Sequence, residues 1–261
     1  MTESEQLLQA VAEVARLAGR AALAAFHDGI QVEIKPDGSP VTAADRSAED
    51  AAGAWIKSRF PEDGILGEEF GAHLADADRR WIIDPIDGTK AFVRGVPLWG
   101  TLVAVARGEE VLAGAAFFPA LDEMLCAARE QGCWWNDARA GVSQTSELSQ
   151  ATVLTTDERF RKTPERLSGW RELAGQADVS RTWGDCYGYF LVATGRAEVM
   201  VDPVMSPWDA AALMPAIVEA GGRFTDWNGR ATAFGGNAIA TNSALADKAR
   251  TVLRGGEARA P

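Results

Sequence analysis

The chain has few of the residues that support imidazole or disulfide chemistry. Its 261 residues include two histidines, His27 and His73, and three cysteines. The histidines are expected at the surface, one at a helix end and one in a loop, so catalysis is not expected to depend on imidazole. The cysteines form no CxxC pair, and an odd number cannot all pair within one chain. A reducing, cytoplasmic location is therefore expected, with the cysteines as packing residues.

Long hydrophobic runs and an excess of positive charge are also missing. No stretch approaches the ~20 apolar residues that a membrane-spanning helix needs. The segment 1–26 begins with acidic residues and is interrupted by charges, so it does not resemble a secretory signal. Lysine and arginine number 26 against 37 aspartates and glutamates, for a net charge of −11. This balance argues against an extended nucleic-acid surface. The partner is expected to be a small molecule, with no membrane or nucleic-acid partner.

The order of apolar and turn-forming segments predicts mixed layers of helix and sheet. The expected helices are 5–26, 42–60, a segment within 157–173, 187–193, 208–220 with a kink at Pro215, and a last helix from 243. The expected strands are 31–34, 65–67, 81–83, three in a meander over 100–128, 152–155, one near 181, 198–201, 223–225 and 238–240. A turn-rich loop is expected at 35–40 and a disordered tail at 255–261. A weakly marked division near residue 150 separates an N-terminal part, 1–150, from a C-terminal part, 151–261.

The most informative segment is WIIDPIDGTK, residues 81–90. An apolar run leads into Asp84 and Asp87, and a proline fixes the backbone between them. Such a turn can point both carboxylates and an intervening carbonyl to one side. Magnesium prefers oxygen ligands of this kind. Gly88 and Thr89 are expected to open a helix whose amides would meet a phosphate.

Three further acidic residues lie at the ends of predicted elements. Glu68 follows a predicted strand, and Asp45 and Asp209 lie in the first turns of predicted helices. Thr42 and Asp45 form a pattern like a capping box. Each of these acids could equally be a helix cap or a solvated surface carboxylate, and DxxDG alone could be an Asx turn. The residues by themselves leave open whether the four acidic sites meet in one cleft.

The ordered set VTAADR, GEEF, WIIDPIDGTKAF and PWDAAAL…EAGG resembles the pattern of the inositol monophosphatase superfamily over about residues 41–222. The combination is specific, because DPIDGT, the upstream GEE and the downstream WD occur in the same order. The resemblance implies an α/β layered fold, an αβαβα sandwich with the active site between two sheets. It also implies a phosphomonoesterase with two or three Mg²⁺ ions, commonly assembled as a homodimer.

The resemblance assigns the metal ligands residue by residue. It implies that Glu68, Asp84 and the Ile86 carbonyl bind one magnesium ion. Asp84, Asp87 and Asp209 would bind a second ion. Glu68 would also reach a third, weakly held ion through water.

The resemblance further implies the catalytic and phosphate-binding groups. Asp45 and the Thr89 hydroxyl would orient the nucleophilic water, and the amides of Gly88 and Thr89 would hold the phosphate. A phosphate monoester is anionic and repels hydroxide, so positive charge must neutralise it during an in-line displacement. No covalent phosphoenzyme is required.

Two segments are similar to the histidinol-phosphate phosphatase branch of this superfamily, FVRGVPLWGTL at 92–102 and WGDCY at 183–187. Asp185 stands where inositol enzymes usually carry a small polar residue. Asp202 falls where the family places a substrate-contacting acid, usually Glu. Both acids would suit the amine and imidazole of histidinol phosphate. Asp185 could instead cap the following helix, and Arg94 could contact substrate or form a structural ion pair.

Other functions compete with histidinol-phosphate phosphatase. One is an inositol-1-phosphate or broad sugar-phosphate phosphatase with the same chemistry. Another is an adenosine 3′,5′-bisphosphate nucleotidase, which would need extra basic residues in the pocket, and the sequence offers few obvious candidates. A non-catalytic metal- or ligand-binding scaffold is the alternative from a different class. The presence of the water-orienting pair Asp45 and Thr89 argues against the scaffold.

Overall fold

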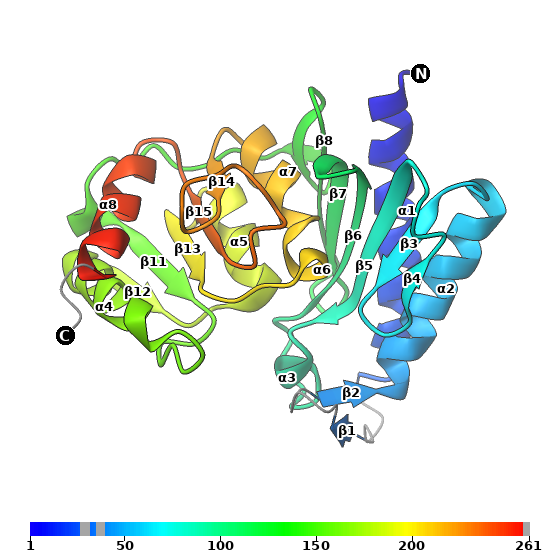
Figure 1. Cartoon of the computed structure of the whole chain (residues 1–261), viewed down its shortest axis with the longest axis horizontal. Helices are drawn as coiled ribbons and strands as arrows, with labels where there is room; N and C mark the ends of the chain where they lie inside the picture. The colour runs from blue at the N-terminus through cyan, green and yellow to red at the C-terminus, as the bar shows by residue number, and fades with distance from the viewer. Residues whose placement is uncertain (27–31, 35–39, 258–261) are drawn as a thin grey trace.

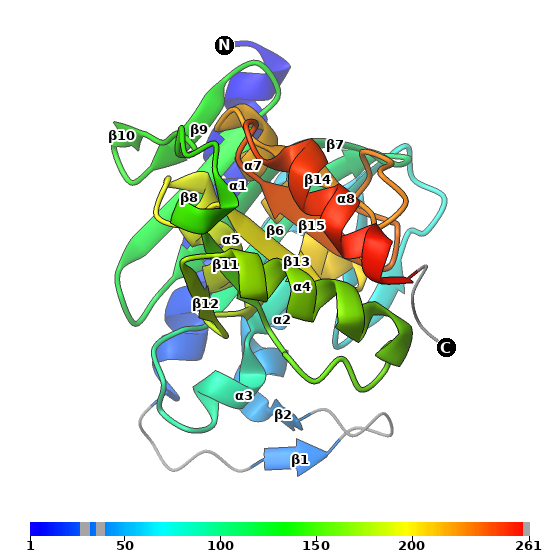
Figure 2. The same ribbon diagram turned by 90° about the vertical axis from the view of Figure 1, so that its left-hand side faces the viewer.

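Alternating layers of helix and sheet build the protein, whose computed structural model describes residues 1–26, 32–34 and 40–257 (Figure 1). Its α-helices are α1 (Glu3–Leu23), α2 (Ala43–Arg59), α3 (Thr89–Phe92), α4 (Leu167–Gln176), α5 (Asp185–Ala193), α6 (Pro207–Ala210), α7 (Leu213–Glu219) and α8 (Ala246–Glu257). α1 and α2 cover the outer face of the larger of two sheets, and α4 and α8 cover that of the smaller. α5, α6 and α7 lie between the sheets (Figure 1). In Figure 2, α4 and α8 lie in front of the smaller sheet. This order of layers confirms the predicted αβαβα sandwich.

The larger sheet is formed by β3 (Gly64–Gly67), β4 (Gly71–His73), β5 (Arg79–Asp87), β6 (Gly100–Arg107), β7 (Glu110–Phe118), β8 (Glu123–Ala128), β9 (Gly132–Trp135) and β10 (Ala138–Arg139). Its spatial order is β10-β9-β8-β7-β6-β5-β3-β4, and only the β3–β5 pair is parallel among the strands described. A two-stranded ribbon of β1 (Val32–Ile34) and β2 (Pro40–Thr42) lies beside α3.

The smaller sheet contains β11 (Thr152–Thr155), β12 (Val179–Arg181), β13 (Val199–Asp202), β14 (Arg223–Thr225) and β15 (Ala238–Thr241). Its order is β12-β11-β13-β15-β14, with β11 parallel to both of its neighbours. β3, β5, β11 and β13 end toward the space between the sheets where polar side chains gather. Carboxyl ends of parallel strands are where open α/β sheets bind their ligands.

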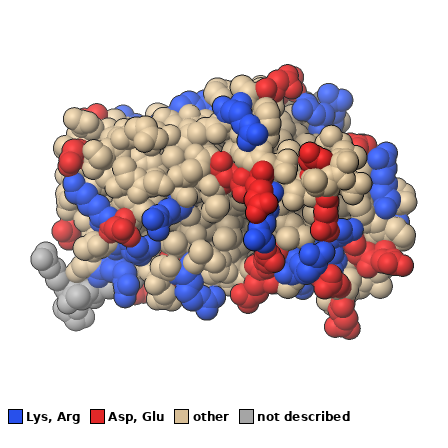
Figure 3. All heavy atoms as spheres, turned by 90° about the horizontal axis from the view of Figure 1, so that it is seen from above, with Lys and Arg blue, Asp and Glu red and all other residues tan. Residues whose placement is uncertain are grey.

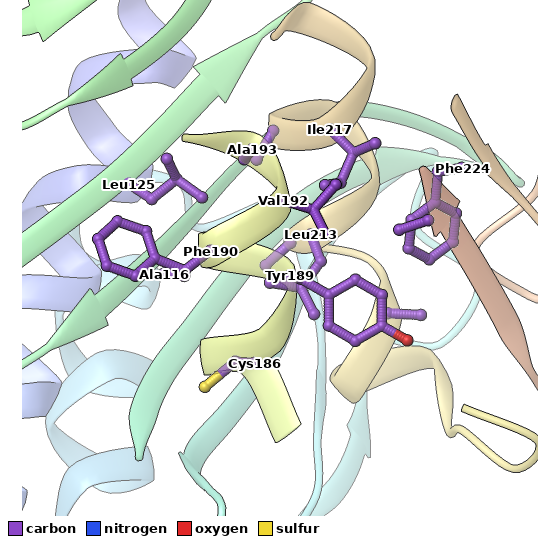
Figure 4. Packing of buried hydrophobic residues seen from close by; sticks show 14 of the residues in the cluster. Ala116, Leu125, Cys186, Tyr189, Phe190, Val192, Ala193, Leu213, Ile217 and Phe224 are labelled. Carbon is purple, nitrogen blue, oxygen red and sulfur yellow. The ribbon is translucent and has the colours of Figure 1, made fainter. Parts of the chain in front are cut away.

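Among the described residues, three hydrophobic cores hold the layers together, because strand residues alternate between faces. One of them lies between the smaller sheet and the helices α4 and α8. On β6, Leu102 and Ala104 face an inter-sheet core, whereas Val103 and Val105 face α1 and α2. The inter-sheet core also receives Phe190 of α5 and residues of the smaller sheet (Figure 4). Buried residues from both parts of the chain share it, and the division near residue 150 stays a prediction.

Several predicted element bounds are wrong for identifiable reasons. The helix expected at 208–220 is broken between α6 and α7, because the Pro215 ring would clash with the carbonyl four residues earlier in a continuous helix. Pro215 instead lies in the first turn of α7, where a missing N–H is tolerated. The helix expected within 157–173 starts only at Leu167, after a 3₁₀ turn that opens with Pro164.

The C-terminal helix starts later and ends later than expected. It begins at Ala246 instead of residue 243, and it continues through residues 255–257, which were predicted to be disordered. His73 lies exposed on β4 and not in a loop. The predictions for His27, residue 31, the loop 35–39 and the tail 258–261 fall outside the described residues.

Charged side chains of both signs are distributed over the surface. On the face seen in Figure 3, acidic and basic side chains are interspersed. Among the described residues, no helix is both long and apolar enough to cross a bilayer. The three cysteines are free and buried, as predicted.

Gly114 allows the closest approach between the larger sheet and the α6–α7 connection. It lies opposite Ala104 and Ala127, which makes a stripe of small residues across β6, β7 and β8. A Cβ at Gly114 would lie 2.4 Å from the carbonyl oxygen of Ala212.

We expect Gly114→Ala to destabilise the protein by about 1–3 kcal/mol, because the added methyl overpacks the interface. Thermal unfolding measures the effect. Gly175→Ala is the matched control, since a Cβ at this helical position meets nothing within 4 Å, and it should leave stability equal or slightly raised. Equal melting temperatures for Gly114→Ala and wild type would contradict the role of the close contact.

Candidate metal centre

A bulge in β5 turns two carboxylates toward the same side of the sheet. Asp84 lies opposite Leu102 and Asp87 lies opposite Gly100, so β5 has one extra residue over this stretch. In a regular strand, residues three apart point to opposite faces. The extra residue reverses that alternation, and Ile86 consequently packs with the α1-side core. Both aspartates are thereby directed to the space between the sheets.

Asp209 approaches the same place from α6. It is the third residue of that helix, and one of its carboxylate oxygens accepts the Ser206 N–H at 2.7 Å. This capping interaction fixes the rotamer of the side chain. Ligand atoms of Asp84, Asp87 and Asp209 all lie within 4.8 Å of one another. Two of the acidic sites predicted from the sequence therefore meet.

Glu68 belongs to the same group of charges. It follows β3, and its N–H extends the pairing with β5 by donating to the Ile83 carbonyl at 3.2 Å. Burial, followed by the charges of Glu68 and Asp87, raises the pKa of Asp84 well above its ordinary value. Glu68 and Asp209 also line one cleft of about 500 Å³.

The electrostatics of this cluster fit a divalent cation. Burial raises the pKa of Asp209 to about 6, and burial with the charges of Asp185 and Asp209 raises the pKa of Asp87 well above its ordinary value. The carboxylates repel one another in a low-dielectric space, which a bound cation would offset. Carboxylate and carbonyl oxygens are the donors that Mg²⁺, Ca²⁺ and Mn²⁺ take.

The turn after β5 contains the Thr89 hydroxyl and the N-terminal amides of α3. Gly88 caps α3 with a positive φ of 87°, a conformation that favours glycine. The Thr89 hydroxyl donates to the Ile86 carbonyl at 3.0 Å. Amides in the first turn of a helix have no intrahelical acceptor. Gly88 and Thr89 therefore open a helix, as predicted from the sequence.

Asp45 is held at the start of α2 by its own turn. The predicted capping box with Thr42 is present, and the Thr42 N–H and hydroxyl donate to the same Asp45 oxygen at 2.8 and 2.7 Å. Asp45 is 1% exposed. Burial raises its pKa to about 6, with smaller contributions from Glu69 and Glu68. Asp45 thus lies near the Glu68 turn, and its other oxygen is not used by the cap.

Asp185 and Asp202 line the cleft in different ways. Asp185 is half-buried, has a positive φ of 50°, and is the first residue of α5, directly after the N-cap Gly184. Whether Asp185 supports the start of α5 or contacts a substrate stays a prediction. Burial raises its pKa to about 6, and the charge of Lys90 opposes the rise. Asp202 is 5% exposed, and its two oxygens accept the Tyr189 hydroxyl at 3.0 Å and the Thr156 N–H at 3.3 Å.

Other residues of the site were not identified from the sequence. Thr156 joins the two acids, because its N–H donates to Asp202 and its hydroxyl accepts the Asp185 N–H at 2.8 Å. The cleft also contains three cationic side chains, which are Lys90, Arg161 and Lys162. A polar residue directly after a strand was the available signal for Thr156. Lys90 is the last residue of the WIIDPIDGTK segment, and Arg161 and Lys162 are neighbours in the segment after β11 that carries no recognisable motif.

Removing divalent cations should destabilise the protein most at high pH. The folded-state pKa values of Asp209 and Asp202 are raised from 3.8 to about 6 and about 7. These groups stabilise the folded state below about pH 4, and that contribution is lost as pH rises through 6–7. The difference in Tm between protein with Mg²⁺ and protein treated with chelator should therefore be larger at about pH 8 than at about pH 5. A rise equal at both pH values would contradict the proposed charge cluster.

The comparisons with known proteins agree with this geometry. Residues 3–256 match the Inositol monophosphatase family. The chain is 42% identical over 252 residues to a histidinol-phosphatase of Chlorobaculum parvum, a match that covers 96% of this chain and 97% of that protein. It is 38% identical over 241 residues to a histidinol-phosphatase of Mycobacterium tuberculosis, covering 87% and 89%.

The fold also matches a solved structure closely. The crystal structure of the extragenic suppressor protein SuhB from Bartonella henselae superposes with a TM-score of 0.89 at 28% identity, over 95% of this chain and 98% of that one. The family match covers nearly the whole chain, including every acidic residue of the cluster. The chain therefore belongs to the inositol monophosphatase family.

Proposed function

We propose that the protein is a Mg²⁺-dependent phosphomonoesterase that holds two or three ions at the acidic cluster. The observation that carries the proposal is the convergence of ligand atoms of Asp84, Asp87 and Asp209 within 4.8 Å. Asp87 and Asp209 line a cleft together with Glu68. Membership of the inositol monophosphatase family supports the same chemistry. By resemblance to the superfamily, the proposal includes a homodimeric, cytoplasmic enzyme.

The proposed ligands divide into two sets around the shared Asp84. Glu68, Asp84 and the Ile86 carbonyl would hold one ion, and Asp84, Asp87 and Asp209 a second. Bound there, the ions would neutralise the phosphate, acidify the attacking water and stabilise the leaving oxygen. The Ile86 carbonyl accepts the Thr89 hydroxyl, so this proposed ligand and the proposed catalytic hydroxyl belong to one turn.

The chain's own groups orient the reactants. Gly88 and Thr89 would direct their amides at the phosphate oxygens. Asp45 would accept a proton from the attacking water, since its raised pKa of about 6 suits a group that receives a proton near neutral pH. The Thr89 hydroxyl would accept the water's second hydrogen bond and keep it in line with the leaving oxygen.

Histidinol phosphate is the proposed substrate. Its leaving group carries an amine and an imidazole, and Asp185 is a half-buried carboxylate in the same cleft as the metal cluster. Asp185 also lies beside the phosphate turn, with one oxygen 3.4 Å from the Cβ position of Gly88. Asp202 lies deeper and accepts a hydrogen bond from the Tyr189 hydroxyl. Its carboxylate would pair with the amine or imidazole of the substrate. The two relatives named histidinol-phosphatase support this substrate.

A phosphate ester with a second anionic group is the alternative that the structure favours. The sequence offered few obvious basic residues for such a substrate. The cleft nevertheless contains Lys90, Arg161 and Lys162, of which the last two lie on its opposite wall, after β11. A second phosphate could pair with these side chains. Adenosine 3′,5′-bisphosphate therefore belongs among the substrates to be compared.

Phosphate release tests the proposed function directly. The kcat/KM values for histidinol phosphate, inositol-1-phosphate and adenosine 3′,5′-bisphosphate should be compared with Mg²⁺ and with chelator. We expect histidinol phosphate to be preferred and the chelator to abolish turnover. Asp84→Asn should lower turnover by about 100-fold or more while circular dichroism shows a folded protein. Undiminished turnover in this variant would contradict the metal assignment, and preference for another ester would remove the substrate claim.

Asp185→Asn should separate cation recognition from phosphate chemistry. A lost charge-assisted hydrogen bond is worth about 1.5–3 kcal/mol, so we expect KM for histidinol phosphate to rise by roughly 10- to 100-fold. Hydrolysis of inositol-1-phosphate, which carries no cation, should change little or improve. Equal losses on both esters would indicate that Asp185 acts on the phosphate or the fold instead.

A further inference from the structure

Glu49 is a buried carboxylate beside the metal cluster that the mechanism above does not use. It lies on α2 one helical turn after Asp45, so both side chains point to the same side of that helix. Glu49 is only 3% exposed. Its position is therefore in the contact between α2 and the end of β3.

The Glu49 carboxylate holds the backbone that carries Glu68. One oxygen accepts the Glu69 N–H at 2.8 Å and the other accepts the Phe70 N–H at 3.0 Å. The Glu68 N–H itself donates to Ile83 of β5. Three successive amides after β3 are thus fixed, one by the sheet and two by Glu49.

Gly67 makes room for this arrangement. A Cβ at Gly67 would lie 1.8 Å from a Glu49 carboxylate oxygen, although Gly67 has no unusual φ that would itself require glycine. The turn 67–70 is therefore wrapped around the carboxylate, which fills the space where a side chain of residue 67 would lie. Glycine at this position is explained by the carboxylate.

Packing alone does not account for an acid here. Burial raises the pKa of Glu49, the charges of Glu69 and Glu68 act in the same direction, and the two backbone N–H groups oppose them. A neutral side chain would fill the α2–β3 contact without adding charge to an acidic region. A carboxylate, however, can accept from two adjacent amides at once and fix the direction of the residue before them.

We propose that Glu49 is a positioning residue for Glu68, which it aims at the cation site by clamping the amides of the two following residues. The proposal rests on the proposed metal-dependent function. Groups that orient metal ligands without touching the metal typically change metal affinity by about 10- to 100-fold when they are removed. Glu49 would act in this way through the backbone, as it reaches no ligand atom itself.

The test is Mg²⁺ binding by the Glu49→Gln variant, measured by isothermal titration calorimetry and by the Mg²⁺-dependent rise in Tm. Glutamine offers only one acceptor oxygen, so one of the two amides loses its partner. We expect Mg²⁺ affinity to fall by about 10-fold or more. Gly67→Ala, which displaces the carboxylate, should weaken binding in the same direction and serves as the second variant if Glu49→Gln does not fold.

Glu219→Gln is the matched control. Glu219 on α7 clamps two amides of the β8–β9 turn in the same manner, from Glu130 at 3.0 Å and Gly132 at 2.7 Å. Its variant should lower Tm without changing Mg²⁺ affinity. Unchanged affinity in Glu49→Gln, or equal losses in both variants, would overturn the positioning role. A wild-type protein that binds no Mg²⁺ would overturn the proposed function, and this proposal with it.

Discussion

Repulsion among buried carboxylates is the constraint on which the arrangement of this protein depends. Asp84, Asp87 and Asp209 lie too close together to be charged at low cost, and burial adds to that cost. Each carboxylate is nevertheless held by rigid structure: a bulged strand for two of them and a capped helix for the third. A flexible loop would let the charges separate. Rigid elements keep them together, so the repulsion is relieved by protonation at low pH and by a bound cation at higher pH.

The layered fold supplies those rigid elements from both sides. β3 and β5 bring Glu68 and the Asp84–Asp87 pair from the larger sheet, and α6, which carries Asp209, packs against β5 and β6 of that sheet. The smaller sheet contributes Thr156 and Asp202 at the ends of β11 and β13. Both sheets therefore contribute residues to one cleft, with Glu68 and Asp87 from the larger sheet and Thr156 and Asp202 from the smaller.

Much of this arrangement could be predicted from the sequence, because the acidic motifs are local. DPIDGT can be recognised from its own residues. Its order with GEE and WD indicated the family and the αβαβα fold, which the structure and the comparisons confirm. Long-range features could not be predicted this way. The bulge depends on pairing with β6, and the Glu49 clamp joins residues 20 or more positions apart. Pro215 was identified as a disruption, but the position of the break depends on a clash within the helix. The roles assigned to individual site residues stay predictions.

The most direct test of cation binding at the acidic cluster is anomalous scattering from Mn²⁺ in crystals grown with Mn²⁺ and phosphate. Mn²⁺ takes the same oxygen ligands as Mg²⁺ and its position can be seen without ambiguity. We expect anomalous peaks bounded by Asp84, Asp87 and Asp209 and by Glu68, with phosphate between the peaks and the amides of Gly88 and Thr89. Crystals with Mn²⁺ bound elsewhere, or with these carboxylates separated and free of metal, would contradict this expectation.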